Sequence, residues 1–361
     1  MPYFTSKGVG IVGMAAAVPK NKVDSGSFKE RFDEAVIDKF VKSTGIGASH
    51  QTLPNQTASD LGFAAAENLL NSLHIDRKKI GILVFVTLSP DYRKPATSCV
   101  LQKRLGLPTY CACMDVGHGC AGFVYGNQVM QSLMMGSDAE LGLLVLGETT
   151  SKVISKGDHN SMMFGDAGAA ILYEHRDDEE HLSLLQADGN RFRSLIVPAG
   201  GFRDMNPEVT EYISGDGVKH SKYDMFMDGM TVFVFSTNDV PKTINEYLDK
   251  IGKNAEDFQS VFFHQANRYI LQVLTKKFHL PKEKVPICLD RYGNTSSVSI
   301  PLTICDHYGH MDGGVEDVLA CGFGVGLAWG VTTLRLDPKT ILPILETDEY
   351  FAEGVIDTSA L

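Results

Sequence analysis

Two distant segments of the chain repeat the same order of features, and this repeat constrains the fold more than any other property of the sequence. Each segment begins with a short apolar strand and continues through an Asp-containing turn to a Gly-rich segment. The first repeat comprises residues 82–87, 113–120, 143–147 and 165–170, and the second comprises residues 261–263, 288–294 and 318–326. Such internal similarity indicates that one α/β unit has been duplicated.

Apolar runs and helical patterns alternate along the chain. The runs are rich in Val, Ile, Leu and Phe, as expected for buried strands. They cover residues 82–87, 143–146, 169–173 and 261–263. Residues 57–73 and 240–251 show the spacing of helices with one buried face. We therefore predict an α/β protein whose parallel sheet is covered by helices on both faces.

The chain is predicted to contain three parts. Residues 1–175 form an N-terminal half, residues 176–336 form a C-terminal half, and residues 337–361 form an extension to which the sequence assigns no role. The acidic run 177–180 is predicted to be a solvent-exposed connection between the halves. A chain of 361 residues is long enough for two such units.

Composition and charge exclude several classes of protein. Hydrophobic residues make up 43% and charged residues 21% of the chain, which excludes a disordered or fibrous protein. A net charge of −11 argues against a nucleic-acid partner, and no apolar run reaches the roughly 20 residues of a membrane helix. Seven cysteines without paired zinc spacing predict a reducing cytoplasm and no metal site.

Cys120 is the first candidate for chemistry. It follows Gly117-His-Gly119 and precedes the apolar segment 121–125, so that a strand ends, the chain turns and a helix begins at this cysteine. The positive end of a helix dipole stabilises a thiolate, which favours a nucleophilic role. The alternative is a packing role, because free cysteine is among the most buried residue types.

His264 and Asn294 are the other two candidates. His264 ends the apolar strand 261–263, and Asn294 lies in the segment 293–297. Taken separately, each has an ordinary structural interpretation, the histidine as a hydrogen-bonding residue and the asparagine as a turn or cap residue. In a doubly wound sheet, however, all three candidates are predicted to follow the carboxyl ends of strands. That edge is where ligands bind.

Six motifs occur in a fixed order between about residues 8 and 335. They are Thr44–Ile46, Asp115 with Gly119–Phe123, Phe164–Ala169, His264–Asn267, Asp290–Ser296 and Gly322–Gly330. Their order and spacing resemble those of the β-ketoacyl-acyl carrier protein synthase III branch of the thiolase superfamily. The resemblance implies a thiolase-like fold, in which duplicated α/β halves form a layered α-β-α-β-α architecture. It also implies an acyltransferase of fatty acid biosynthesis, a cytoplasmic homodimer with no permanently bound cofactor.

The same resemblance implies a catalytic triad of Cys120, His264 and Asn294. Cys120 would carry an acyl primer as a thioester, taken from acyl-CoA or acyl-carrier protein. His264 and Asn294 would stabilise the enolate that forms when malonyl-acyl carrier protein loses carbon dioxide. The backbone N–H groups of Cys120 and Val325 would form the second oxyanion hole.

Several positions depart from the family pattern. Gly47, Ala48 and Ser49 follow the Thr-Gly-Ile motif, where members that use acetyl-CoA usually have arginines. The single tryptophan is Trp329, and His159 is the residue nearest to the place of a further nucleotide-contacting arginine. These departures predict weak binding of CoA esters. Donors delivered on a carrier protein are therefore expected to acylate Cys120 faster than the matching CoA esters.

Two further sites are predicted with open alternatives. Lys94 occupies the position from which the family reaches into the partner subunit's acyl pocket, and it either gates that pocket or extends into solvent. Arg268, Lys276 and Lys277 form a basic set that is either a docking face for acyl carrier protein or an ordinary solvated helix face.

Three functions follow from the sequence. The favoured one is a condensing enzyme that joins a primer on Cys120 to malonyl-acyl carrier protein by decarboxylative Claisen chemistry. The second is a synthase III-like acyltransferase or condensing variant of a specialised pathway that does not use acetyl-CoA. The third, a non-catalytic partner subunit, is disfavoured because all three triad residues are present.

Overall fold

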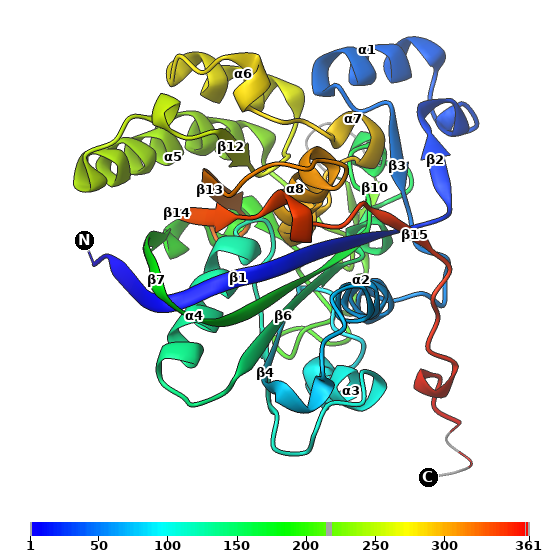
Figure 1. Ribbon diagram of the computed structural model, residues 1–361. Coiled ribbons are helices and arrows are strands. Elements are labelled where there is room, and N and C mark those ends of the chain that lie inside the picture. Colours follow the sequence, from blue (N-terminus) through cyan, green and yellow to red (C-terminus); the bar gives the residue numbers. More distant parts are fainter. Residues whose placement is uncertain (1, 214–218, 358, 360–361) are drawn as a thin grey trace.

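The computed structural model describes residues 2–213, 219–357 and 359. Within these residues a nine-stranded sheet runs through the molecule in the order β12-β13-β14-β7-β6-β4-β5, and β1 pairs with both β7 and β15 (Figure 1). The strands of this sheet are β1 Phe4–Pro19, β4 Ile80–Val86, β5 Ala112–Val116, β6 Leu141–Glu148, β7 Ala167–Ala187, β12 Ser260–Phe263, β13 Glu316–Gly324, β14 Ala328–Leu336 and β15 Leu345–Thr347. The predicted runs of apolar residues lie in strands, except Thr87, which follows the end of β4. The prediction of a parallel sheet is wrong, because β7 pairs antiparallel with β1, β6 and β14, and β14 pairs antiparallel with β13.

Helices cover the sheet in layers. They are α1 Glu34–Thr44, α2 Ala58–Ser72, α3 Thr97–Arg104, α4 Gly122–Met135, α5 Gly229–Ile251, α6 Arg268–Lys277, α7 Leu289–Tyr292 and α8 Ser299–Tyr308. Short strands β2 Lys22–Asp24, β3 Ala48–His50, β8 Leu195–Ile196, β9 Glu211–Ile213, β10 Lys219–Ser221 and β11 Phe226–Met227 form two-stranded sheets beside them. In Figure 1, α5 and α6 lie at one end of the view, and α2 and α3 lie at the other.

Three buried hydrophobic clusters account for the layering. One joins α2 and α3 to β4 and β6, and a second joins α5 and α6 to β12 and β13. The third is central and contains residues of α4 and α8 together with residues of both sets of strands. Successive side chains of a strand point to opposite faces of the sheet, so every second side chain faces the central helices and the side chains between them face the outer helices. The result is the layered α-β-α-β-α architecture predicted from the resemblance.

Strand β7 joins the two halves. Its first part pairs with β6, and residues 183–187 pair with β14, so the predicted boundary between residues 175 and 176 lies inside this strand. The prediction that residues 177–180 form a solvent-exposed connection holds only in part, because three of the four are exposed but all of them lie within strand β7. Glu179 is buried and lies 3.0 Å from Nε2 of His181, while its three acidic neighbours face solvent. The alternation of a strand thus accommodates an acidic run.

Helix α5 begins earlier than its apolar pattern predicts. Asp228 caps it by accepting a hydrogen bond from the Thr231 N–H (3.1 Å), and the helix then continues through Pro241 to Ile251. The additional turns before Val240 matter for function, because they form part of a cavity wall described below.

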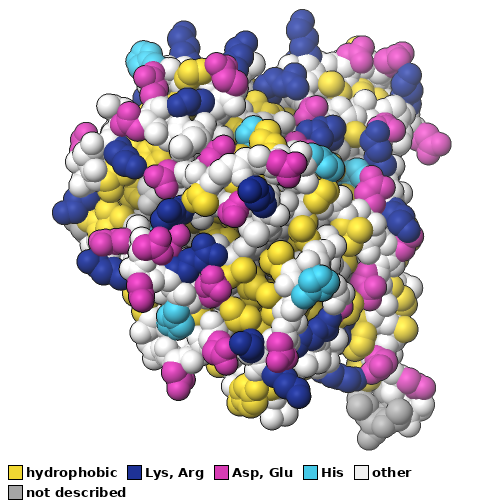
Figure 2. All heavy atoms as spheres, in the orientation of Figure 1, with side chains coloured by type: hydrophobic (Ala, Val, Ile, Leu, Met, Phe, Trp, Pro, Cys, Tyr) yellow, Lys and Arg dark blue, Asp and Glu magenta, His cyan; other side chains and the backbone are white. Residues whose placement is uncertain are grey.

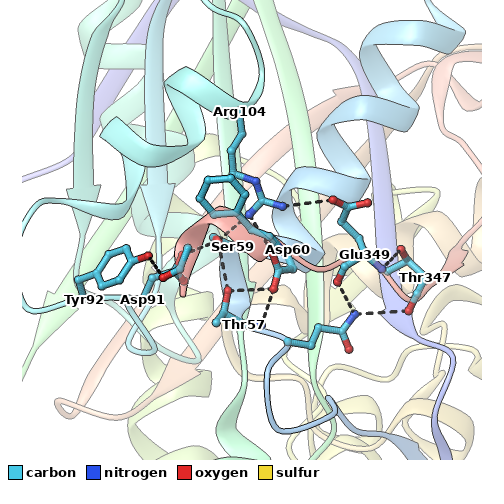
Figure 3. Close-up of polar contacts among 11 residues, drawn as sticks. Thr57, Ser59, Asp60, Asp91, Tyr92, Arg104, Thr347 and Glu349 are labelled. Atoms are coloured by element: carbon cyan, nitrogen blue, oxygen red, sulfur yellow. Dashed lines mark hydrogen bonds and ion pairs between the residues drawn. The ribbon is translucent and has the colours of Figure 1, made fainter. Parts of the chain in front are cut away.

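The C-terminal extension is a strap across the N-terminal half. Strand β15 pairs in parallel with Ala17–Pro19 of β1. Beyond it, the Glu349 carboxylate lies 3.4 Å from Arg104, and Arg104 is paired with Asp60 at 2.9 Å in a site closed to solvent (Figure 3). The Arg104 guanidinium also lies over the ring of Phe351. A buried charge needs such partners, and the C-terminal extension supplies two of them to the Arg104 guanidinium, the Glu349 carboxylate and the Phe351 ring.

None of the helices in the described part of the chain is long and apolar enough to cross a membrane.

Candidate active site

The three candidate residues lie on separate elements that meet at one cavity of about 680 Å³. Cys120 lies in the turn between β5 and α4, and His264 directly follows β12. Asn294 does not follow a strand, as the sequence predicted, but the short helix α7. Gly293, with φ of +69°, ends that helix and turns the chain back toward the cavity. All three side chains nevertheless line the same space.

The Cys120 thiol lies close to the backbone of β13 and the turn that follows it. The backbone N–H groups of Val325 and of Cys120 itself act to lower the pKa of the thiol, and Ser296 Oγ lies 4.0 Å from the sulfur. Gly324 is required by this approach, because a Cβ there would lie 2.7 Å from Sγ. Cys120 and Val325 are also the residues whose N–H groups are predicted to form the oxyanion hole, and that role stays a prediction.

The expectation of a thiolate stabilised by a helix terminus is wrong. Burial raises the pKa of the Cys120 thiol, and this effect outweighs the N–H groups of Val325 and Cys120, which lower it. The physical reason is desolvation: the fixed N–H dipoles replace only part of the hydration that an anion would have in water. The resting enzyme therefore holds Cys120 as a thiol at neutral pH.

His264 is held as a neutral imidazole. Its Nδ1 lies 2.7 Å from Ser299 Oγ, and the ring lines the cavity. Burial lowers the pKa of His264 to about 3, and a hydrogen bond with the Ser296 backbone opposes this shift only in part. At neutral pH the ring therefore carries no charge, and it acts as a hydrogen-bonding group and not as a cation.

Asn294 is fixed through its backbone and its side-chain oxygen. Its N–H donates to the Met163 carbonyl (2.9 Å), and its Oδ1 accepts a hydrogen bond from the Ser296 N–H (3.0 Å). The amide NH₂ is the group that remains to donate to a ligand. His264 and Asn294 thus offer two neutral donors to the same cavity.

Glu148 also lines this cavity, and the sequence analysis did not identify it. It is the last residue of β6 and is 1% exposed. Burial raises the pKa of its carboxyl to about 8. The available signal was its place at the carboxyl end of the predicted strand 143–146, on the edge of the sheet where the other candidates were expected.

Most of the remaining cavity wall is apolar. It comes from the segment between β8 and α5 and from the first turns of α5, together with residues near the ends of β6 and β12. These residues include Val153, Met163, Leu195, Ile196, Val197, Met225, Met227, Val232, Phe233 and Ile270. Such an apolar wall favours a ligand made of methylene and amide groups over a charged ligand.

The other predicted site residues lie outside the cavity of their own chain. Lys94 is exposed on the loop between β4 and α3. Arg268 lies at the start of α6 and donates to the Gly45 carbonyl at 3.3 Å. Lys276 and Lys277 lie at the end of α6, where Lys277 donates to the Thr237 carbonyl of α5 at 2.9 Å.

Comparison with known proteins gives consistent results. The 3-oxoacyl-[acyl-carrier-protein (ACP)] synthase III family matches residues 114–189, and the family of its C-terminal domain matches residues 248–336. A beta-ketoacyl-[acyl-carrier-protein] synthase III of Clostridium perfringens is 30% identical over 332 residues, which covers 90% of this chain and 98% of that protein. A homologue of the same name from Fusobacterium nucleatum is 31% identical over 334 residues, or 91% of this chain and 98% of that one.

Two solved structures that are similar to this chain carry the same kind of family name as its sequence relatives. A crystal structure of 3-oxoacyl-(acyl-carrier protein) synthase from Burkholderia xenovorans has a TM-score of 0.89 and 35% identity, covering 96% of this chain and 99% of that one. A 3-oxoacyl-(acyl carrier protein) synthase III from Pseudomonas aeruginosa has a TM-score of 0.77 and 27% identity, with coverages of 92% and 99%.

The nine-stranded sheet and these relatives define a condensing enzyme with a thiolase-like fold. The chain belongs to the β-ketoacyl-acyl carrier protein synthase III family, a family of acyltransferases. The fold and enzyme class predicted from the sequence are thereby confirmed.

Proposed function

We propose that this enzyme takes an acyl primer onto Cys120 and condenses it with malonyl-acyl carrier protein by decarboxylative Claisen chemistry. One observation carries the proposal: Cys120, His264 and Asn294 line one cavity, and Val325 lines it with them. A nucleophile, two neutral donors and a pair of backbone N–H groups are the groups that this reaction needs.

In the first half-reaction, the Cys120 sulfur attacks the carbonyl carbon of the donor thioester. A new C–S bond forms as the donor's C–S bond breaks, and the thiol proton of Cys120 ends on the departing thiol. The N–H groups of Cys120 and Val325 stabilise the oxyanion of the tetrahedral intermediate. Because these donors are fixed by the backbone, they need no reorganisation as the charge develops.

In the second half-reaction, the malonyl thioester enters the same cavity. Its bond to the carboxylate breaks, carbon dioxide leaves, and the electron pair moves into the thioester carbonyl to form an enolate. Asn294 Nδ2 and the Nε2–H of neutral His264 stabilise the enolate oxygen. The enolate carbon attacks the acyl-Cys120 carbonyl, a C–C bond forms, and collapse of the intermediate breaks the C–S bond to release the β-ketoacyl product. Cys120 leaves as a thiolate and takes one proton from water to return to the thiol.

Product analysis tests this function. The enzyme is incubated with an acyl thioester and malonyl-acyl carrier protein, and the intact masses of enzyme and carrier are followed with the release of carbon dioxide. Condensation gives an acyl adduct on Cys120 and then a β-ketoacyl carrier. An adduct that passes to an acceptor without loss of carbon dioxide would instead support the acyltransferase alternative.

The primer donor is proposed to be a carrier protein. Where CoA-using members of the family usually have arginines, Ala48 and Ser49 are buried in β3, and His159 packs against Phe32 at 4.9 Å. Each charge-assisted hydrogen bond contributes roughly 1.5–3 kcal/mol, so their absence weakens CoA binding. A carrier protein supplies binding energy through its own surface.

We expect Cys120 to be acylated at least about tenfold faster by an acyl-carrier protein than by the matching acyl-CoA. The measurement is the rate of adduct formation by intact mass, with the same acyl chain and equal donor concentrations. Rapid, saturable acylation by acetyl-CoA at micromolar concentration would contradict this prediction.

Helix α6 is proposed to form part of the carrier docking face. Asn267 and Ile270, at its start, line the cavity, so its charged residues Arg268, Lys276 and Lys277 lie on an element that borders the site. Figure 2 shows Lys and Arg side chains along the edge over α6, with acidic side chains interspersed. Such a local basic set steers an acidic carrier although the whole chain is acidic.

The enzyme is proposed to be a homodimer. Strand β5 ends the order of the sheet, and within the described residues β4 is its sole partner strand. Its side chains are partly exposed, and Tyr110 before it is 70% exposed. An open sheet edge next to exposed apolar residues is a template for pairing with a second copy. In that dimer, Lys94 of one subunit would approach the cavity of its partner.

Light scattering at micromolar concentration is expected to give twice the 39.4 kDa mass of the chain. The physical reason is that pairing of the two β5 edges satisfies their free N–H and C=O groups. A mass of one chain would contradict this prediction and would leave Lys94 without a pocket to gate.

A further inference from the structure

The loop between β4 and α3 forms part of the cavity wall, and the proposed mechanism assigns no role to it. Leu88 and Ser89, near its start, line the cavity together with Cys120. Leu88 also lies against Gly119, the residue before Cys120, because a Cβ on Gly119 would be 2.9 Å from Leu88 Cδ1. The conformation of this loop therefore shapes the cavity beside the nucleophile.

The start of the loop is fixed at the end of β6. The Leu88 N–H donates to Glu148 Oε1 (3.1 Å), and the Ser89 hydroxyl lies 3.0 Å from Glu148 Oε2. These contacts hold only two residues of the loop. Surface loops with few contacts are the mobile parts of a protein, so the residues that follow need anchors of their own.

The C-terminal extension can serve as such an anchor, because it is itself held on α2 and the residues before it. The Gln56 side chain donates to the Glu349 carbonyl (3.0 Å), and the Phe351 N–H donates to Asp60 Oδ1 (3.1 Å). Figure 3 shows Asp60 and Glu349 in one polar cluster with the buried guanidinium of Arg104. The extension thus has a fixed position on the N-terminal half.

Tyr92 joins the loop to this extension. Its hydroxyl donates to the Gly354 carbonyl at 2.5 Å. Its neighbour Asp91 accepts a hydrogen bond from the Ser59 hydroxyl of α2 at 2.6 Å. A residue near the end of the chain thereby holds a loop that lines the cavity.

Arg93 extends this connection to a second part of the cavity wall. Its Nη2 donates to the Gly200 carbonyl at 2.7 Å, and its guanidinium lies over the Phe202 ring. Gly200 lines the cavity. A displacement of Tyr92 would therefore reach the wall from two sides, through Leu88 and through Gly200.

We propose that Tyr92 is a positioning residue, which uses its hydrogen bond to Gly354 to hold the loop 88–93 in the conformation that binds the acyl donor. Without this contact the loop populates several conformations, and the apparent affinity for a ligand falls with the fraction of the binding-competent one. The chemistry at Cys120 is unchanged, because Tyr92 does not line the cavity. This inference rests on the proposed function, because its readout is the acylation of Cys120.

The test measures acylation of Cys120 by intact mass at several donor concentrations. The donors carry acetyl, butyryl, hexanoyl or octanoyl groups on the same acyl carrier protein. Each donor that acylates the wild-type enzyme gives a half-saturating concentration and a maximal rate. Tyr92→Phe removes only the hydroxyl and keeps the ring. Gly354→Ala disturbs the contact from the other side, because a Cβ there would lie 3.1 Å from the Tyr92 hydroxyl and 2.7 Å from a ring carbon of Phe351.

We expect each variant to raise the half-saturating concentration by about two- to tenfold, the effect of one hydrogen bond, and to leave the maximal rate unchanged. The double variant should lose no more than the larger of the single losses, because both changes remove the same contact. Once the enzyme has been acylated to completion, carbon dioxide release from malonyl-acyl carrier protein should be unchanged. The hydrogen bonds that hold the His264 ring and the Asn294 side chain come from the C-terminal half.

Glu353→Gln is the matched control. It breaks the exposed ion pair with Lys103, in the same part of the extension, and leaves the contact of Tyr92 with Gly354 in place. Exposed ion pairs contribute little, so acylation should stay at the wild-type level.

Several outcomes would overturn the inference. Unchanged half-saturating concentrations in Tyr92→Phe, while the enzyme forms adducts, would overturn the role of Tyr92 alone. Losses that multiply in the double variant, an equal loss in Glu353→Gln, or a fall in carbon dioxide release by the same factor would each count against the contact, because they indicate a general effect on the structure. Absence of an adduct on Cys120 in the wild-type enzyme with all four donors would overturn the proposed function, and this inference with it.

Discussion

Replacing Cys120 by serine is expected to abolish acyl-enzyme formation, with a loss on the order of 10³-fold or more. The hydroxyl is a far weaker nucleophile than the thiol, while the N–H groups around it are unchanged. Three of the other six cysteines are not expected to substitute, because Cys288, Cys305 and Cys321 are buried and burial raises the pKa of each. Peptide mapping after incubation with the cognate donor should find the acyl group on Cys120 alone.

The exposed Cys99 provides a matched control, because Cys99→Ser removes a thiol outside the cavity and should leave acylation unchanged. Alkylation of the wild-type enzyme adds a pH test. Since burial raises the pKa of the Cys120 thiol, the rate of its alkylation should increase as pH rises above neutrality. An adduct retained in Cys120→Ser would remove the basis of the mechanism, and an alkylation rate independent of pH would contradict the thiol resting state.

The second large effect concerns the two donors to the enolate. His264→Ala and Asn294→Ala should each lower decarboxylation of malonyl-acyl carrier protein by roughly 10²–10³-fold, the cost of removing one oxyanion donor. Self-acylation of Cys120 should persist, because it depends on the sulfur and on the N–H groups of Cys120 and Val325. Carbon dioxide release and adduct formation, measured on the same samples, separate the two effects.

A control and a pH profile sharpen this test. His310 is exposed and lies outside the cavity, so His310→Ala should not change either half-reaction. Because burial lowers the pKa of His264 to about 3, the ring stays neutral as pH falls from 8 to 5, and protonation of His264 should cause no loss of decarboxylation in that range. Unchanged carbon dioxide release in both alanine variants would refute the assignment.

The C-terminal extension shows where prediction from sequence stops. Residues 337–361 carry no motif that the analysis could use, yet β15 pairs with β1, and Glu349 is close to Arg104. Arg104 and Asp60, in turn, lie on two different helices. Such a network joins residues from opposite ends of the chain, so no local pattern reveals it. Residues 358, 360 and 361 lie outside the described part of the extension.

The sequence by itself determined the strands, most helix positions and the order of the motifs that identify the family. These features depend on neighbouring residues, because side-chain periodicity and turn chemistry are local. The sequence also predicted that Cys120, His264 and Asn294 lie together after the carboxyl ends of strands, and all three line one cavity, although Asn294 follows α7 and not a strand.

Only the tertiary structure decided the ionisation of the active-site groups, and only it showed that Glu148 lines the active-site cavity. A helix terminus favours a thiolate at Cys120, but the pKa depends on how much water the surrounding chain removes, and that burial comes from residues far away in the sequence. In the same way, burial raises the pKa of the Glu148 carboxyl to about 8, although hydrogen bonds from Leu88, Ser89 and Ser297 act to lower it. Desolvation is a property of the assembled fold, and the local sequence does not contain it.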